Sequence, residues 1–128
     1  MKEEIISFKR GDTIFSQGAD SDCVYFIRAG KVGLFSDESS SKRPLKVLST
    51  DDIFGEMGLI ENKPRSASAM ALEDCRVSVM KRMEFNYLTK HRKDFFVALL
   101  RTLTERLRLT LKKLKAKPTI ALSRRFKF

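Results

Sequence analysis

The hydrophobic pattern of this 128-residue chain changes near Arg82, and that change limits the folds that the chain can form. Before Arg82, short apolar runs alternate with turn-forming pairs such as Gly11-Asp12 and Ala29-Gly30. The apolar runs cover residues 13–15, 23–27, 32–35, 45–48, 66–70 and 76–80. Short strands spaced about ten residues apart are typical of a sandwich, jelly roll or barrel. We therefore predict a mainly β fold here, with a hairpin tip in the polar run 37–43.

After Arg82 the pattern becomes helical. It predicts a short helix over 83–90 and a long helix over 93–117, which Pro118 ends. One set of residues on the long helix recurs at alternating steps of four and three: Phe96, Leu100, Leu103, Leu107, Thr110 and Leu114. This is the spacing of a coiled-coil seam, whose period is about 3.5 residues. Because no second long helix is available in the chain, we predict a homodimer through this helix. The alternative is an amphipathic helix docked on its own barrel.

Basic side chains are concentrated in the second part of the chain. The chain holds 26 Lys and Arg against 16 Asp and Glu, a net charge of +10. Residues 1–75 carry 10 basic and 13 acidic side chains, whereas residues 76–128 carry 16 basic and 3 acidic ones. A basic end of this kind attracts nucleic acid, an anionic lipid surface or an acidic partner protein. The alternative is a solvated helix face that keeps the protein soluble.

The sequence offers little for catalysis. Its one histidine, His91, lies in the polar link between the two predicted helices, where we expect it at the surface. A metal site of the cupin kind needs several histidine ligands, and a Ser/His/Asp or Cys/His set needs an oriented imidazole. We therefore expect no enzyme, no catalytic residue, no metal and no cofactor.

The two cysteines and the N-terminus indicate the compartment. Cys23 and Cys75 are far apart and form no Cys-x-x-Cys pair, so we expect both to be reduced core residues. The charged start Met1-Lys2-Glu3-Glu4 is followed by no long apolar run, which argues against a secretory signal. The apolar stretches are shorter than the ~20 residues that cross a bilayer. We expect a cytoplasmic protein with no membrane span.

The segment from Gly55 to Ser66 combines residue types that suit a phosphate joined to a ribose. Gly55 lets the backbone approach a ligand closely. The helical turn that Glu56 begins can offer N–H groups to an anion, and Arg65 can grip the anion through two parallel hydrogen bonds. The Glu56 carboxylate suits a sugar hydroxyl better than a bare phosphate. For a lone Gly-Glu pair or a lone arginine, the alternative is a turn and a surface cation.

The chain resembles the cyclic nucleotide-binding domain family, in particular the sensor half of the catabolite activator proteins. The resemblance covers residues 8–114 and is carried by the segments 8–18, 24–32, 54–59 and 64–67. It implies a β jelly roll with short flanking helices, a long C-terminal helix and a nucleotide bound inside the barrel. Asp51 stands where the family usually has glycine, and aspartate tolerates a left-handed turn.

The resemblance also implies roles for individual residues. Arg65 would pair with the cyclic phosphate, and Glu56 would accept the ribose 2′-hydroxyl. The Ser66 hydroxyl and nearby backbone N–H groups would complete the phosphate cradle, and Leu48 would form a pocket wall against the base. The expected ligand-binding residues are Leu48, Phe54, Gly55, Glu56, Met57, Arg65, Ser66, Ala67, Arg106 and Thr110. The last two belong to the long helix and would meet the base.

We predict a stand-alone sensor of cAMP or cGMP, with the choice between the two nucleotides left open. Residues 1–117 would form the domain and 118–128 a short basic tail. Ligand binding would shift the placement of the long helix. The ten residues after Pro118 are too few for a helix-turn-helix, so sequence-specific DNA binding is not expected. The alternative function is binding of nucleic acid, an acidic partner or anionic lipid through the basic end of the same scaffold.

Overall fold

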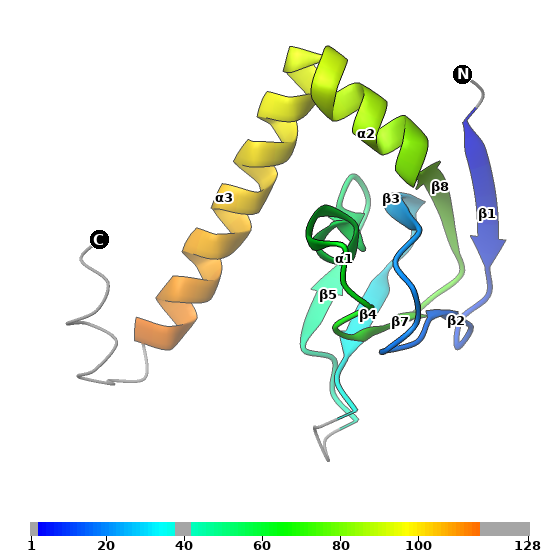
Figure 1. The fold of residues 1–128 in the computed structure, drawn as a ribbon. Coiled ribbons are helices and arrows are strands. Elements are labelled where there is room, and N and C mark those ends of the chain that lie inside the picture. The colour runs from blue at the N-terminus through cyan, green and yellow to red at the C-terminus, as the bar shows by residue number, and fades with distance from the viewer. Residues whose placement is uncertain (1–2, 38–41, 116–128) are drawn as a thin grey trace. The chain divides into compact units, whose positions relative to one another are not determined.

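The structure, a computed structural model, describes residues 3–37 and 42–115 (Figure 1). The chain divides into two compact units, one ending at Asn86 and the other beginning at Tyr87. Residues 38–41 of the expected hairpin tip and the whole expected basic tail, 118–128, lie outside the described residues. The tail, its possible acidic partner and the predicted domain boundaries therefore stay predictions.

The first unit is built from two four-stranded sheets. One sheet has the order β1 (Glu4–Phe8), β8 (Cys75–Lys81), β3 (Cys23–Ala29) and β6 (Ile53–Phe54). The other has the order β2 (Thr13–Phe15), β7 (Ser68–Ala71), β4 (Val32–Phe35) and β5 (Lys46–Leu48). The paired strands run antiparallel, and several strands that follow one another in the sequence lie in different sheets. The predicted mainly β, jelly-roll fold is confirmed.

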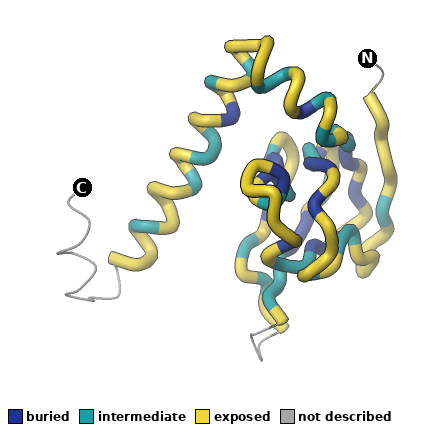
Figure 2. Tube along the Cα trace, in the orientation of Figure 1, coloured by how far each residue is buried: buried dark blue, intermediate teal, exposed yellow. Residues whose placement is uncertain are grey.

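Both sheets contribute to one hydrophobic core. Ile27 and Val77 come from the first sheet, Val32 and Leu48 from the second, and each is at most 1% exposed. Figure 2 shows buried segments in the strands of this unit, next to segments that are intermediate or exposed. Strand side chains alternate between the two faces of a sheet, so an apolar residue at every second position covers one face. The apolar runs of the sequence predicted the central strands, and the structure shows which of their residues form the core.

Two strands were not among the predicted apolar runs. β1 carries Ile5 and Ile6, which are 43% and 36% exposed, so its sequence lacks a clear buried face. β6 is only two residues long and lies directly before the Gly55 turn.

The turn expected from Glu56 onward is a short helix, α1 (Glu56–Glu61). Asp51 has a positive φ of 74°, as expected for aspartate at that position.

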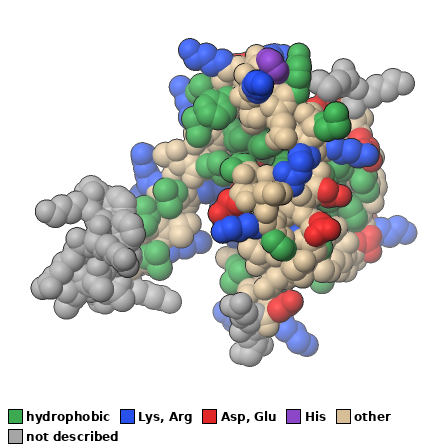
Figure 3. All heavy atoms as spheres, in the orientation of Figure 1, with side chains coloured by type: hydrophobic (Ala, Val, Ile, Leu, Met, Phe, Trp, Pro, Cys, Tyr) green, Lys and Arg blue, Asp and Glu red, His purple; other side chains and the backbone are tan. Residues whose placement is uncertain are grey.

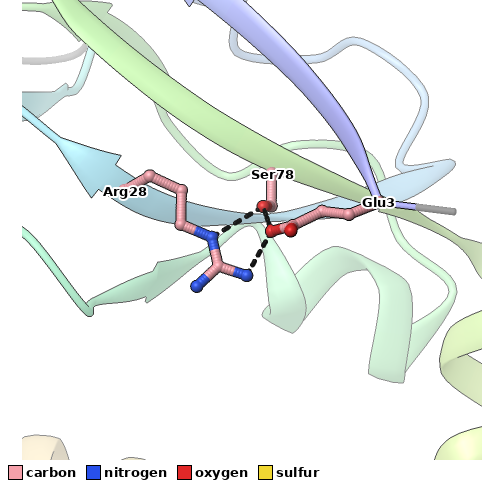
Figure 4. A network of polar contacts seen from close by, with 3 residues as sticks. All are labelled: Glu3, Arg28 and Ser78. Carbon is pink, nitrogen blue, oxygen red and sulfur yellow. Dashed lines mark hydrogen bonds and ion pairs between the residues drawn. The ribbon is translucent and has the colours of Figure 1, made fainter.

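A polar cluster fixes the start of β1 to the sheet (Figure 4). The Glu3 carboxylate accepts hydrogen bonds from Arg28 Nη2 and Ser78 Oγ, and Arg28 Nε donates to Ser78 Oγ at 2.8 Å. These hydrogen bonds, from Ser78 first and then from Arg28, hold the pKa of Glu3 below its ordinary value. The three side chains border a pocket of about 260 Å³, whose other walls include Phe26 and Met80. The cluster therefore links Glu3, just before β1, to the central strands β3 and β8.

Two helices follow the strands. α2 (Arg82–His91) crosses the division between the two units, and α3 (Lys93–Lys115) lies in the second. The predicted helices at 83–90 and 93–117 are confirmed for the described residues, which end at Lys115. His91 is exposed, as expected. None of the helices in the described part of the chain is long and apolar enough to cross a membrane.

The predicted seam of α3 is largely at the surface. Leu100 is 47% exposed and Leu107 59% exposed. Apolar side chains and Lys and Arg side chains both reach the surface along this helix (Figure 3). Exposed leucines at heptad spacing agree with the sequence pattern, and the predicted homodimer stays a prediction.

Replacing Gly30 by alanine is expected to destabilise the first unit more than replacing Gly11. Both glycines have φ near +90°, so either substitution forces a side chain into the left-handed region. At Gly30 the new Cβ would lie 2.5 Å from the Asp74 carbonyl oxygen and from Cys75 Cβ, whereas nothing lies within 4 Å at Gly11. We expect a loss of about 1 kcal/mol at Gly11 and at least about 2–3 kcal/mol at Gly30 in urea unfolding. Equal losses would contradict the packing described at Gly30.

Candidate functional site

The candidate site begins where β6 meets α1. Gly55 adopts the left-handed conformation, with φ 83° and ψ 4°, and is the N-cap residue of α1. The cap residue itself makes no side-chain hydrogen bond to the first turn of the helix, because glycine has no side chain. A Cβ at this position would lie 2.7 Å from Nη1 of Arg65 and 3.4 Å from the Tyr25 ring. Only glycine therefore permits this approach of the turn to the arginine.

Arg65 lies in the loop between α1 and β7 and is only 4% exposed. Its Nη1 donates to the Gly55 carbonyl at 2.6 Å, and its Nη2 donates to the Cys23 carbonyl at 2.7 Å. Both acceptors are neutral, so these hydrogen bonds hold the guanidinium without neutralising its charge. The Nε atom is buried and has no hydrogen-bond partner among the described residues. A buried cation with an unused donor is a strong attractor for an anion.

The backbone around Arg65 is held by the opposite loop. The Arg65 N–H donates to the Ala19 carbonyl at 2.8 Å, and the Gly18 N–H donates to the Arg65 carbonyl at 2.9 Å. This reciprocal pair fixes the position of the arginine Cα relative to the turn after β2. The side chain is therefore anchored at its backbone and at the terminal nitrogens of the guanidinium.

Two aromatic rings lie beside the guanidinium, and a third stacks on one of them. The Arg65 Cζ atom is 4.3 Å from the centre of the Phe15 ring and 5.8 Å from that of Tyr25. Tyr25 stacks on Phe54, with ring centres 5.0 Å apart and an interplanar angle of 14°. A cation within about 6 Å of a ring centre is attracted by the electrons of the ring face. Phe15 and Tyr25 were not among the predicted site residues.

Burial also affects the titratable groups next to the arginine. It raises the pKa of the Cys23 thiol and that of the Tyr25 phenol, so both groups are neutral at pH 7. Cys23 Sγ lies 3.7 Å from Arg65 Nη2. Both cysteines of the chain are free and buried, as the sequence indicated. The groups that contact the guanidinium at its Cys23 end, a carbonyl and a thiol, are therefore uncharged.

A second set of contacts fixes α1 against the sheet. Gly58 faces Ser21 so closely that an added Cβ would overlap the Ser21 hydroxyl. Ser21 Oγ donates to the Lys63 carbonyl at 2.6 Å, and Arg82 Nη2 donates to the Ser21 carbonyl at 2.5 Å. Arg82 Nη1 also reaches the Leu59 carbonyl at 3.2 Å. The sequence reasoning missed Ser21 and Arg82, because neither the serine nor the arginine belongs to a recognisable motif.

Eight of the ten predicted site residues lie in the first unit. Leu48, Phe54, Glu56 and Arg65 are all buried in the first unit. The exposure of the others in this unit varies: Gly55 and Ala67 are half-buried, and Met57 and Ser66 are exposed.

Two predicted residues belong to the second unit. Arg106 and Thr110 lie on α3, where Thr110 Oγ1 donates to the Arg106 carbonyl at 2.9 Å. Their contact with a ligand therefore stays a prediction. In the described part of the chain, no group of three or more His, Cys, Asp or Glu side chains is arranged to hold a metal ion.

A family model described as the cyclic nucleotide-binding domain matches residues 5–92. The chain belongs to the cyclic nucleotide-binding domain family. The match begins at the second residue of β1, covers the rest of the first unit, including Gly55, Glu56 and Arg65, and continues through α2. The resemblance inferred from the motifs is thus confirmed.

Named relatives agree with this assignment. The chain is 31% identical over 106 residues to a CRP-like cAMP-activated global transcriptional regulator of Mycobacterium tuberculosis, covering 82% of this chain and 47% of the regulator. The catabolite activator protein of Thermus thermophilus is similar in structure, with a TM-score of 0.77 and 30% identity. That match covers 89% of this chain and 54% of the solved chain.

A third similar structure is that of an EAL enzyme, Bd1971, solved in a cAMP-bound form with a TM-score of 0.65 and 32% identity. The match covers 97% of this chain and 34% of the enzyme. The same enzyme has also been solved in a cGMP-bound form. This chain therefore spans about half or less of the length of these relatives.

Proposed function

We propose that the chain binds a cyclic nucleotide, cAMP or cGMP, at the site formed by the α1 turn and Arg65. The observation that carries the proposal is the buried guanidinium of Arg65, whose Nε donor has no partner among the described residues. It lies beside Gly55 at the start of α1, where the backbone N–H groups of a helix start favour an anion. Membership of the cyclic nucleotide-binding domain family and the cAMP-bound form of Bd1971 support the choice of ligand.

Each part of the ligand has residues that suit it. The cyclic phosphate is singly charged and pairs with Arg65, with the Ser66 hydroxyl and the backbone N–H groups near Gly55, Met57 and Ala67 as further donors. The Glu56 carboxylate is buried and accepts from the ribose hydroxyl. Apolar walls are provided by Leu48 and Phe54, both 1% exposed. Arg106 and Thr110 contact the base from α3 in the bound state.

We assign the chain a regulatory role without catalysis of its own. The Mycobacterium tuberculosis relative is named as a cAMP-activated regulator, which supports this role. The ligand acts by binding one placement of α3 more tightly than others, which shifts their populations. The free, buried cysteines fit the reducing cytoplasm, which is the setting we propose.

The output element is a homodimer formed through the seam of α3. Its leucines at heptad spacing are exposed in the single chain and would be buried between two copies. A long helix shared by two protomers would communicate a change at one site to the other protomer. Dimerisation and nucleotide binding are separate proposals and are tested separately.

The binding proposal is tested by titration calorimetry with cAMP and cGMP. Wild-type protein is expected to bind at least one of them, and Arg65→Ala to weaken that binding by at least about 30-fold, since a buried charged contact is lost. Arg92→Ala is the matched control, because Arg92 is an exposed arginine whose partner is Asp94 at the start of α3. Circular dichroism verifies that each variant is folded. Absence of heat with folded wild-type protein and either nucleotide would overturn the proposal.

The dimer proposal is tested by analytical ultracentrifugation of wild type, Leu107→Glu and Leu109→Glu. Both leucines lie on α3 and are similarly exposed, 59% and 50%, but only Leu107 belongs to the seam. Leu107→Glu is expected to raise the dimer dissociation constant by at least about tenfold, because a carboxylate in the seam is desolvated. Leu109→Glu is expected to leave it within about twofold of wild type. A monomeric wild type at millimolar concentration, or equal effects of both substitutions, would contradict the proposed dimer.

A further inference from the structure

Phe15 faces the core because of an irregularity in β2. Ile14 and Phe15 are neighbours in this strand and yet both pack against the same hydrophobic core. Regular alternation would place them on opposite faces of the sheet. The pairing of β2 with β7 shifts between Thr13, opposite Met70, and Phe15, opposite Ala69, which marks a β-bulge. A bulge re-aims the side chain that follows it, here the Phe15 ring.

The ring that the bulge turns inward lies against Arg65. Its centre is 4.3 Å from Arg65 Cζ, nearer than that of Tyr25 at 5.8 Å. Phe15 is itself held by its aromatic neighbours, since its ring centre is 5.8 Å from that of Tyr25 and 6.0 Å from that of Phe54. The contact is therefore one between a fixed ring and a buried cation.

The Phe15 ring restrains a motion of the Arg65 guanidinium that its hydrogen bonds do not restrain, namely motion toward the ring. The bonds to the Gly55 and Cys23 carbonyls hold the Nη1 and Nη2 ends of the guanidinium. They do not neutralise the charge, and they leave Nε without a partner. A ring packed against the guanidinium limits its motion toward that ring, and the ring electrons stabilise the charge during burial. Phe15 thus acts on both the orientation and the electrostatics of Arg65.

We propose that Phe15 is a positioning residue for anion capture: its ring holds the Arg65 guanidinium with the Nε donor ready for the phosphate of the ligand. This inference rests on the proposed binding of a cyclic nucleotide. It assigns to β2 a part in the site, although Phe15 itself need not touch the ligand. An aromatic side chain at position 15 is required, and an aliphatic one of similar volume is not sufficient.

The test compares Phe15→Leu, Phe15→Tyr and Phe8→Leu by calorimetric titration with cAMP and cGMP. Phe8 is a matched control, because it is also a partly buried phenylalanine packed against the same core. Phe15→Leu is expected to weaken nucleotide binding between about 2- and 30-fold, the range of a cation–π contact. Phe15→Tyr keeps the ring and is expected to restore binding to within about threefold of wild type. Phe8→Leu is expected to bind like wild type, and urea unfolding of each variant gives its stability.

A double-mutant cycle separates positioning from general packing. In the Arg65→Ala background, Phe15→Leu is expected to change the residual affinity by less than about twofold, because the group that it positions is gone. Wild-type affinity in Phe15→Leu, an equal loss in Phe8→Leu, or an undiminished loss in the Arg65→Ala background would overturn the role of Phe15. If any of these results is found while the wild-type protein itself binds a nucleotide, the proposed function still stands. Wild-type protein that binds neither nucleotide would overturn both.

Discussion

The burial of one positive charge, that of Arg65, is the constraint on which the rest of the site depends. Moving a guanidinium out of water costs several kcal/mol unless nearby groups offset the loss. Here the carbonyl oxygens of Gly55 and Cys23 accept two of its hydrogen bonds, and the Phe15 ring lies against its central carbon. These partners are neutral, so the arrangement holds a charge that an anion can still neutralise.

The surrounding backbone is organised so that this arrangement can exist. Gly55 accepts a left-handed conformation and brings its own carbonyl to the guanidinium, which no residue with a Cβ could do without displacing Nη1. Ser21 and Gly58 fix α1 against β3, and the loop that carries Arg65 is bonded to the turn at Gly18 and Ala19. The ligand would therefore meet a site whose parts are held in place before binding, which lowers the entropy lost on association.

The sequence predicted the parts of this structure that depend on local pattern. Apolar runs indicated the central strands, and heptad spacing indicated α3. Gly55, Glu56 and Arg65 could be found because their chemistry is visible in one short segment. Phe15 and Cys23 could not, since they reach Arg65 through strand register and a β-bulge, across 50 and 42 positions of sequence. β6 was missed because a strand of two residues shows no periodicity. Whether α3 contacts a ligand could not be predicted from a local pattern, because it depends on how two separate units are placed.

The most direct measurement is the ¹H–¹⁵N spectrum of the arginine side chains during titration with cAMP or cGMP. The Arg65 Nε–H signal is assigned by its disappearance in Arg65→Lys. The account predicts that this signal moves downfield as the nucleotide saturates the protein, because an unpartnered donor gains a charged acceptor. Exposed arginines such as Arg92 should show no comparable shift. A nucleotide that binds to saturation and leaves the Arg65 Nε–H signal unmoved would contradict the central claim that this buried donor captures the phosphate.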